Sequence, residues 1–234
     1  MRLNRYLAAC GLGSRRTCEQ FIREGRVSIN GHFIRELATT VAPDDEVRVA
    51  GRQLKPPMEP VVIALHKPKG ILSTRSDERG RETIYSLVPG SFGRLFHVGR
   101  LDKDSEGLIL LTNDGALSRD LSHPSRKAEK EYEVTLDAPL QADMIPRLVK
   151  GLPVEGKRAR MERVHPIAPH VVRVVLTQGL KRQIRVMFSR IGLNVKRLVR
   201  VRIGSLQLGA LKPGHWRPLQ KSEIAALRDS CPVR

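Results

Sequence analysis

The stretch "GRLDKDSEGLILLTNDG", residues 99–115, joins an acidic turn directly to an apolar run. Three carboxylates, those of Asp102, Asp104 and Glu106, fall within five positions of the turn. The apolar run predicts a buried β-strand over residues 107–112. The turn has three functional interpretations: a metal loop, a pair of acids that cleaves sugar bonds, or one working carboxylate with polar neighbours. A purely structural acidic turn next to a strand is the fourth.

The spacing of the acids argues against calcium and against a paired-acid glycosidase. The acids and Gly107 match the first half of an EF-hand loop, but the twelfth position, which needs a bidentate Glu, holds Asn113. A glycosidase places two carboxyl groups on opposite sides of a sugar ring, and adjacent acids on one loop cannot do that alone. One working carboxylate and a structural turn therefore both stay open.

Outward from this stretch, strand and helix patterns do not alternate regularly enough for a doubly wound parallel sheet. The run "VVIALHKP", which follows residue 60, begins a strand-rich body. The patterns predict an α+β fold with a mixed or antiparallel sheet. The expected strands lie near residues 94–98, 107–112, 130–136, 171–177 and 203–208, and the expected helices near 114–121, 140–149 and 181–191.

The first sixty residues predict a small module of two helices and a hairpin. Ser14 is placed to cap the second helix, which carries Arg15 and Arg16. The run "RVSINGHFI" alternates around Asn30-Gly31, a strong hairpin signal. This order resembles the S-four-like RNA-binding module, in which the arginine-bearing helix faces RNA. The alternative is a tiny domain whose arginines only solvate its surface.

The run "KPPMEP", residues 55–60, has three prolines and no periodicity, which is typical of a semi-rigid linker. A linker here predicts two domains. We expect the S-four-like module over residues 1–57 and the strand-rich body as a second domain over residues 58–234.

The net charge of +18 is concentrated in one part of the chain. Residues 164–222 contain 12 Lys or Arg and no Asp or Glu, whereas the other 30 basic residues are set against all 24 acids, a net of only +6. Positive charges concentrated in this way repel one another unless an anion binds to them, and a phosphate backbone is the usual anionic partner. A membrane surface fits less well, because no basic amphipathic helix carries a Trp or Phe face.

The cysteines indicate a reducing compartment. Cys10, Cys18 and Cys231 are odd in number and lack metal-site spacing. No run of 18 apolar residues is present, so we expect no membrane span. We therefore expect a cytoplasmic protein.

The run "LTQGLKRQIRVMFSRIG" predicts a strand end followed by a basic helix. Ile184, Met187, Phe188 and Ile191 form the apolar stripe of this helix. Arg185 lies at the edge of the stripe, about 100° from Ile184, where it can be partly buried. A half-buried Arg needs an anion, and a phosphate or a carboxylate would serve.

The run "EKEYEVTL" alternates, so that Lys130, Tyr132 and Val134 share one face of a strand. A Tyr on a strand face usually belongs to the core. The pattern alone therefore gives Tyr132 no function.

Taken together, these motifs resemble the ribosomal-RNA pseudouridine synthases of the small-subunit synthase A type. The resemblance covers nearly the whole chain, and "GRLDxDSxGL" is highly specific to that family. One departure is His66, where the family commonly has Asn. The motifs are "LHKPKGILST" at 65–74, "HVGRLDKDSEGLILLTNDG" at 97–115, "EKEYEV" at 129–134, "LTQGLKRQIRVMF" at 176–188 and "GHWRPL" near 214.

The resemblance implies that Asp102 is the nucleophile of uridine isomerisation, in which the base leaves C1′, rotates in the site and rejoins through C5. It implies that Arg185 pairs with Asp102 and keeps it ionised, and that Tyr132 stacks on the uracil and acts as base toward the sugar. Arg100 would fill the gap left by the flipped nucleotide. Leu198 would form a wall of the uracil pocket.

The resemblance also implies the partners. No metal, redox cofactor or nucleotide is consumed, and we expect a monomer. Ribosomal RNA is the expected substrate, with the large subunit favoured by "LTQGLKRQIR". A non-catalytic RNA-binding ribosome assembly factor is the alternative function, and an RNA glycosidase that releases uracil is a second. The expected RNA contacts are Arg15, Arg16, Lys67, Arg100, Lys181 and Arg182.

Overall fold

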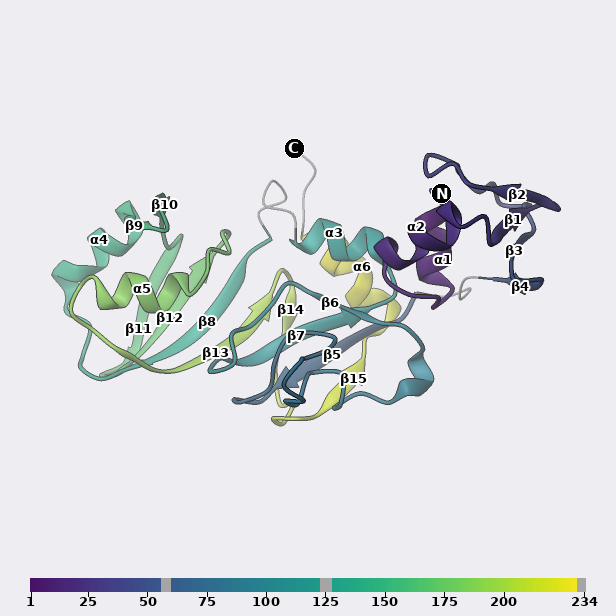
Figure 1. The fold of residues 1–234 in the computed structure, drawn as a ribbon. Coiled ribbons are helices and arrows are strands. Elements are labelled where there is room, and N and C mark those ends of the chain that lie inside the picture. Colours follow the sequence, from purple (N-terminus) through teal and green to yellow (C-terminus); the bar gives the residue numbers. More distant parts are fainter. Residues whose placement is uncertain (56–59, 123–127, 231–234) are drawn as a thin grey trace. The chain divides into compact units, whose positions relative to one another are not determined.

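The computed structural model describes residues 1–55, 60–122 and 128–230 (Figure 1). The chain divides into two compact units. The expected domain boundary after residue 57 and the residue Cys231 both lie outside the described residues. The units are Met1–Pro60 with Gly90–Leu95, and Val61–Pro89 with Phe96–Arg234.

The first unit begins with two packed helices, α1 (Leu3–Ala9) and α2 (Arg15–Arg23). The Ser14 Oγ accepts a hydrogen bond of 3.0 Å from the backbone N–H of Thr17, so the predicted cap is confirmed. The two helices share a buried core, to which they contribute Leu3, Leu7, Cys18 and Ile22.

The first unit continues as a four-stranded antiparallel sheet in the order β2-β1-β3-β4. Asn30 and Gly31 have φ values of 50° and 86°, which is the left-handed backbone that a type I′ turn requires. The predicted hairpin is therefore confirmed. The strands are β1 (Val27–Ile29), β2 (His32–Ile34), β3 (Val47–Val49) and β4 (Arg52–Leu54).

The second unit is built on a nine-stranded sheet whose main order is β11-β12-β8-β13-β7-β5-β15. Strands β13 and β7 run parallel, whereas the other neighbours in this order are antiparallel, so the sheet is mixed as predicted. These strands are β5 (Val62–Lys67), β7 (Glu106–Thr112), β8 (Lys130–Leu136), β11 (Arg163–Ala168), β12 (Val171–Leu176), β13 (Val195–Ile203) and β15 (Trp216–Pro218).

Shorter elements complete this unit. Strand β6 (Phe96–Val98) pairs with β7, β14 (Leu206–Gln207) pairs with β13, and β9 (Leu152–Val154) pairs with β10 (Lys157–Ala159). Helices α3 and α6 lie side by side and bury Leu117, Leu121 and Leu227 against the sheet (Figure 1). The helices are η1 (Gly90–Phe92), which groups with the first unit, α3 (Gly115–Ser122), η3 (Ala142–Met144), α4 (Ile145–Lys150), α5 (Gln183–Ser189) and α6 (Lys221–Asp229).

One predicted strand was misplaced. The pattern indicated a strand over residues 203–208, but the long central strand β13 ends at Ile203 and only Leu206–Gln207 follow as β14. The strand was misplaced because basic residues interrupt the apolar alternation of β13. Several of these basic residues pair with acids on neighbouring strands. Within the described residues, no helix is long and apolar enough to cross a membrane.

Candidate active site

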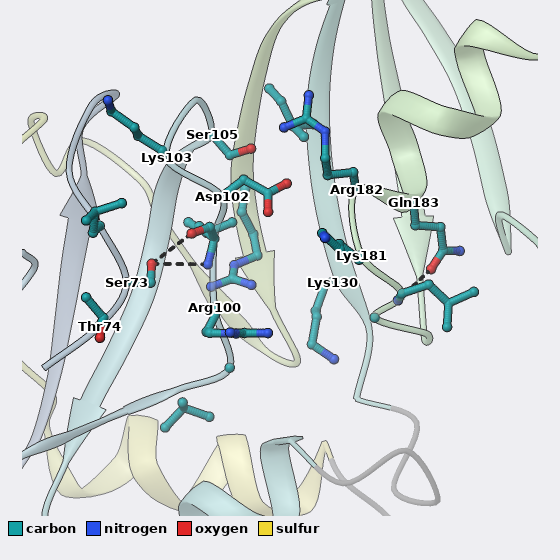
Figure 2. Close-up of a pocket in the computed structure, with 18 of the residues that line it drawn as sticks. Ser73, Thr74, Arg100, Asp102, Lys103, Ser105, Lys130, Lys181, Arg182 and Gln183 are labelled. Carbon is teal, nitrogen blue, oxygen red and sulfur yellow. Dashed lines mark hydrogen bonds between the residues drawn. The ribbon is translucent and has the colours of Figure 1, made fainter. Parts of the chain in front are cut away.

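A cavity of about 870 Å³ opens in the second unit, between the loop that precedes β7 and the segment that leads into α5 (Figure 2). The loop contributes residues 98–103 and 105, and the segment contributes residues 176–184. Six of the residues predicted from the sequence line this one cavity. They are Arg100, Asp102, Tyr132, Lys181, Arg182 and Leu198.

The carboxylate of Asp102 points into the cavity (Figure 2). It has no hydrogen-bond or ion-pair partner among the described residues, and the side chain is half-buried. Its neighbour Asp104 is exposed, and Glu106 forms an ion pair with Arg197 at 2.9 Å. One carboxylate of the acidic turn is thus directed at the cavity without a protein partner.

The backbone around Asp102 is held at every carbonyl from residue 101 to residue 105. The Ser73 hydroxyl donates to the Leu101 carbonyl at 2.9 Å (Figure 2). A turn closes from the N–H of Ser105 to the carbonyl of Asp102 at 3.0 Å. The carbonyl of Lys103 accepts from the Gly70 N–H and the Lys67 ammonium, the carbonyl of Asp104 accepts from Arg185, and the carbonyl of Ser105 accepts from Lys67. These hydrogen bonds hold the backbone of the loop in place on both sides of Asp102.

The expectation that Lys67 contacts RNA is wrong, because its side chain is completely buried. Its ammonium donates to the carbonyls of Pro68, Lys103 and Ser105, at 3.0, 3.3 and 2.7 Å. Burial lowers the pKa of Lys67 to about 8, although nearby carboxylates oppose the shift. Lys67 therefore supports the loop from beneath.

Arg185 also differs from its expected arrangement. In the described part of the chain it forms no ion pair with Asp102; instead its Nη1 donates to the carbonyl of Val195 and its Nη2 to the carbonyl of Asp104, at 2.9 and 3.0 Å. Burial and the neighbouring Arg182 lower the pKa of Arg185, while Asp104 and Asp102 raise it. Arg185 thus holds the backbone of the loop that carries Asp102.

The floor of the cavity is one face of strands β8 and β13. Tyr132 lies directly opposite Arg200, and Val134 lies directly opposite Leu198. Residues opposite each other on paired strands point to the same face. Tyr132, Leu198 and Arg200 therefore share this face, and all three line the cavity.

The acidic turn ends at Gly107, where the neighbouring strand leaves no room for a side chain. Its φ is +104°, and a Cβ placed there would collide with the backbone carbonyl of Arg200 on the parallel strand β13. Only a residue without a side chain lets β7 approach β13 this closely.

Lys181 and Arg182 are exposed at the edge of the cavity (Figure 2). Arg182 has a φ of +52°, a left-handed conformation that is uncommon for a residue with a side chain. The buried Gln183 amide accepts from the N–H of Leu180 and donates to the carbonyl of Arg160, both at 3.2 Å. Gln183 therefore helps to hold the segment that presents the two cations.

The predicted RNA contacts Arg15 and Arg16 lie on α2 of the first unit, and both are exposed. The predicted contact Arg100 is exposed at the cavity. His66, where the resembled family commonly has Asn, joins its Nδ1 to the carbonyl of Leu211 at 2.7 Å. It thereby ties β5 to the segment that precedes β15.

The acid-free region 164–222 is partly neutralised by the fold. Acids from other segments reach several of its arginines, at distances of 2.6 to 4.0 Å. The prediction that all 12 basic residues of this region are unbalanced was therefore too strong. The neutralised residues include Arg173 with Glu131 and Glu133, Arg197 with Glu106, Arg202 with Glu129 and Glu131, and Arg217 with Glu223.

Three further residues line the cavity and were not predicted from the sequence: Arg200, Ser73 and Gln183. Ser73 and Gln183 lie within the motifs at residues 65–74 and 176–188, but the sequence pattern does not indicate which atoms they contact. Arg200 could have been found from its spacing, because it follows Leu198 by two residues and so shares its strand face. The misplaced strand hid that relationship.

Comparison with known proteins gives one answer over the whole chain. Residues 61–190 match the RNA pseudouridylate synthase family, and residues 1–47 match the S4 domain. An uncharacterised RNA pseudouridine synthase of Mycobacterium leprae (strain TN) is 40% identical over 235 residues, which cover 97% of this chain and 92% of the relative. The dual-specificity RNA pseudouridine synthase RluF of Escherichia coli (strain K12) is 40% identical over 229 residues, which cover 97% of this chain and 78% of the relative.

A solved structure agrees. The crystal structure of a pseudouridylate synthase superposes with a TM-score of 0.71 at 29% identity, covering 97% of this chain and 99% of the other. The family match spans more than half of the chain, and the relatives cover nearly all of it. The chain therefore belongs to the RNA pseudouridylate synthase family, whose members isomerise uridine to pseudouridine in RNA, and it carries an S4 domain at its N-terminus.

Proposed function

We propose that this protein converts a specific uridine of ribosomal RNA to pseudouridine, with large-subunit RNA as the favoured substrate and Asp102 as the nucleophile. The observation that carries the proposal is the Asp102 carboxylate, which points into a cavity and has no partner among the described residues. A carboxylate kept free of protein donors remains available to attack a carbon of the substrate.

The cavity suits a nucleotide that has left its helix. A base inside a helix is unreachable, so the target must flip out. Tyr132 would stack on the flipped uracil and act as base toward the sugar, and Leu198 would form an apolar wall. The exposed Arg100 would occupy the space that the flipped nucleotide leaves.

The basic residues divide into two groups. Lys181 and Arg182 are exposed at the edge of the cavity and would bind phosphates beside the target, and Arg15 and Arg16 would bind RNA through the S4 domain. Arg185 is a positioning residue, because its hydrogen bonds go to backbone carbonyls.

The reaction needs no redox partner. The bond between C1′ and N1 breaks, a bond between C1′ and C5 forms, and the proton lost from C5 is matched by one gained at N1. Substrate and product have the same composition, so we propose that no metal, redox cofactor or nucleotide is consumed. We also expect the protein to be monomeric and cytoplasmic.

The test is mass spectrometry of ribosomal RNA after a pseudouridine-specific chemical label. RNA from a strain that lacks this gene should lose one labelled position, and the wild-type gene, but not Asp102→Asn, should restore it. An assembly factor would bind RNA without changing any labelled position. An RNA glycosidase would release free uracil from purified RNA. Either of these results would contradict the proposal.

A further inference from the structure

Arg200 is a buried cation that has no ion-pair partner among the described residues. It lies within β13 and only 2% of its surface is exposed. Its Nε donates to the carbonyl of Leu108 at 2.7 Å, and its Nη2 is buried with no hydrogen-bond partner among the described residues. Leaving a buried guanidinium unpaired is costly, so such groups normally have a partner. The arrangement indicates that the partner of Arg200 is a ligand.

The position of Arg200 indicates where that ligand lies. Arg200 is directly opposite Tyr132 on the cavity face of the sheet, and Leu198 lies two residues earlier on the same face. On its other side β13 pairs with β7 at Gly107, which has no side chain. Arg200 is thus one of the residues that line the cavity into which Asp102 points.

Because Arg200 is buried, we expect it to contact the base of the flipped nucleotide and not its phosphates. Both phosphates of a flipped nucleotide remain joined to the RNA strand, so the base enters a pocket ahead of them. Exposed cations such as Lys181 and Arg182 can take the phosphates at the edge (Figure 2). We propose that Arg200 donates a hydrogen bond to a carbonyl oxygen of the target uracil, an inference that rests on the proposed function.

This contact would act on the reaction itself. When the bond between C1′ and N1 breaks, the base keeps the electron pair, and its negative charge spreads from N1 to the carbonyl oxygens. The same pair is used when C5 bonds to C1′, after which the proton leaves C5 and N1 gains one. A guanidinium fixed in a buried site stabilises such a charge more strongly than water does, because it does not need to reorient. Arg200 is then a catalytic residue.

The test uses an RNA fragment that the wild-type protein converts, synthesised with uridine, 2-thiouridine or 4-thiouridine at the target. Sulfur accepts hydrogen bonds more weakly than oxygen, so one thio fragment should react several-fold more slowly with the wild type in single-turnover assays. Arg200→Met has a similar length without donors and should slow the uridine fragment by about 100-fold. It should also lose the thio effect, because a hydrogen bond already removed cannot be weakened further.

Arg202→Met is the matched control. Arg202 lies on the same strand but pairs with Glu129 and Glu131, at 3.0 and 2.7 Å, so this variant should keep the wild-type rate and the thio effect. Circular dichroism and thermal melting check the folding of each variant. If Arg200→Met does not fold, Arg200→Lys takes its place, because it keeps the charge and changes the donor geometry.

Three results would overturn the inference: the wild type shows no thio effect, the Arg200 variant retains the full effect, or the variant loses RNA affinity and salt dependence while its saturating rate is unchanged. The last result would identify Arg200 as a phosphate contact. Failure of the proposed function is distinguishable, because the wild-type protein itself would then form no pseudouridine in any ribosomal RNA fragment.

Discussion

Arg185 donates a hydrogen bond from its Nη2 to the backbone carbonyl of Asp104, at 3.0 Å, across 81 positions of sequence. Its Nη1 donates at the same time to the carbonyl of Val195, the first residue of β13, at 2.9 Å. One planar guanidinium therefore fixes the loop that carries Asp102 relative to the central strand. The single nitrogen of a lysine cannot reproduce two divergent donors on a rigid plane.

Arg185→Lys should therefore lower the saturating single-turnover rate by about 100-fold, since small displacements of a reacting group cost about that much. RNA affinity should change little, because the guanidinium is committed to backbone carbonyls. Rates at saturation and binding by filter retention measure the two quantities separately. Equal losses in rate and affinity would instead identify Arg185 as a phosphate contact.

The two neighbouring acids should respond oppositely to the same change. Asp102→Asn should reduce pseudouridine formation by at least about 10,000-fold, because the amide has the shape of the carboxylate without its nucleophilicity. Asp104→Asn should stay active, because the atom of residue 104 that bonds to Arg185 is its backbone carbonyl. RNA binding should be retained in both variants. An inactive Asp104→Asn beside an active Asp102→Asn would reverse the assignment.

Lys67 should make stability depend on alkaline pH. Burial lowers its pKa from the ordinary 10.5 to about 8 in the folded protein. Between these two values the unfolded chain binds more protons than the folded protein, so raising the pH favours folding. Lys67→Met cannot titrate. The free energy of unfolding of the wild type, relative to Lys67→Met, should therefore increase with pH across this window.

Urea denaturation of both proteins at several pH values measures this difference. If the difference in the free energy of unfolding between the wild type and Lys67→Met stays constant with pH, Lys67 has the same pKa in the folded and unfolded states. Activity offers a second readout, because neutral Lys67 has fewer N–H donors for its three carbonyls. The turnover of the wild type should accordingly fall as the pH rises above about 8.

Gly107→Ala should be strongly destabilising, by about 3 kcal/mol or more, because strain and overlap add. The new Cβ would meet the backbone carbonyl of Arg200, which cannot move without breaking the pairing of β7 and β13. Gly192→Ala is the control, since Gly192 has a φ of +86° and no atom lies within 4 Å of the point that its Cβ would occupy. Equal losses in the two variants would show that backbone strain alone makes Gly107 necessary.

Local features of this fold were predictable because they depend on neighbours in sequence. The Ser14 cap and the turn at Asn30-Gly31 each involve residues within three positions of one another. The strand β7 was predictable for the same reason, because its apolar run is continuous. In each case the physical cause lies within the segment itself.

The hydrogen bonds that hold the site in place were not predictable from residue spacing, because they join segments that are distant in the sequence. Lys67 reaches Ser105 across 38 positions, and Arg200 reaches Leu108 across 92. Sequence patterns identify a Lys in a motif but do not show whether its side chain is exposed or buried. For that reason the prediction of an RNA contact at Lys67 was wrong, and Arg200 was not predicted as part of the site.

The S4 domain should contribute affinity and not chemistry, because the cavity is lined only by residues of the second unit among those described. Arg15→Ala with Arg16→Ala should raise the RNA concentration that gives half the maximal rate and leave the rate at saturation unchanged. The salt slope of binding should fall by about 0.7–0.9 for each phosphate that is no longer bound, because fewer counterions are released. The control is Arg48→Ala, since Arg48 is exposed in the same unit but pairs with Glu46 at 2.6 Å. Single-turnover rates across a salt series measure all three quantities, and an unchanged salt slope in the double variant would mean that this face of α2 does not bind RNA.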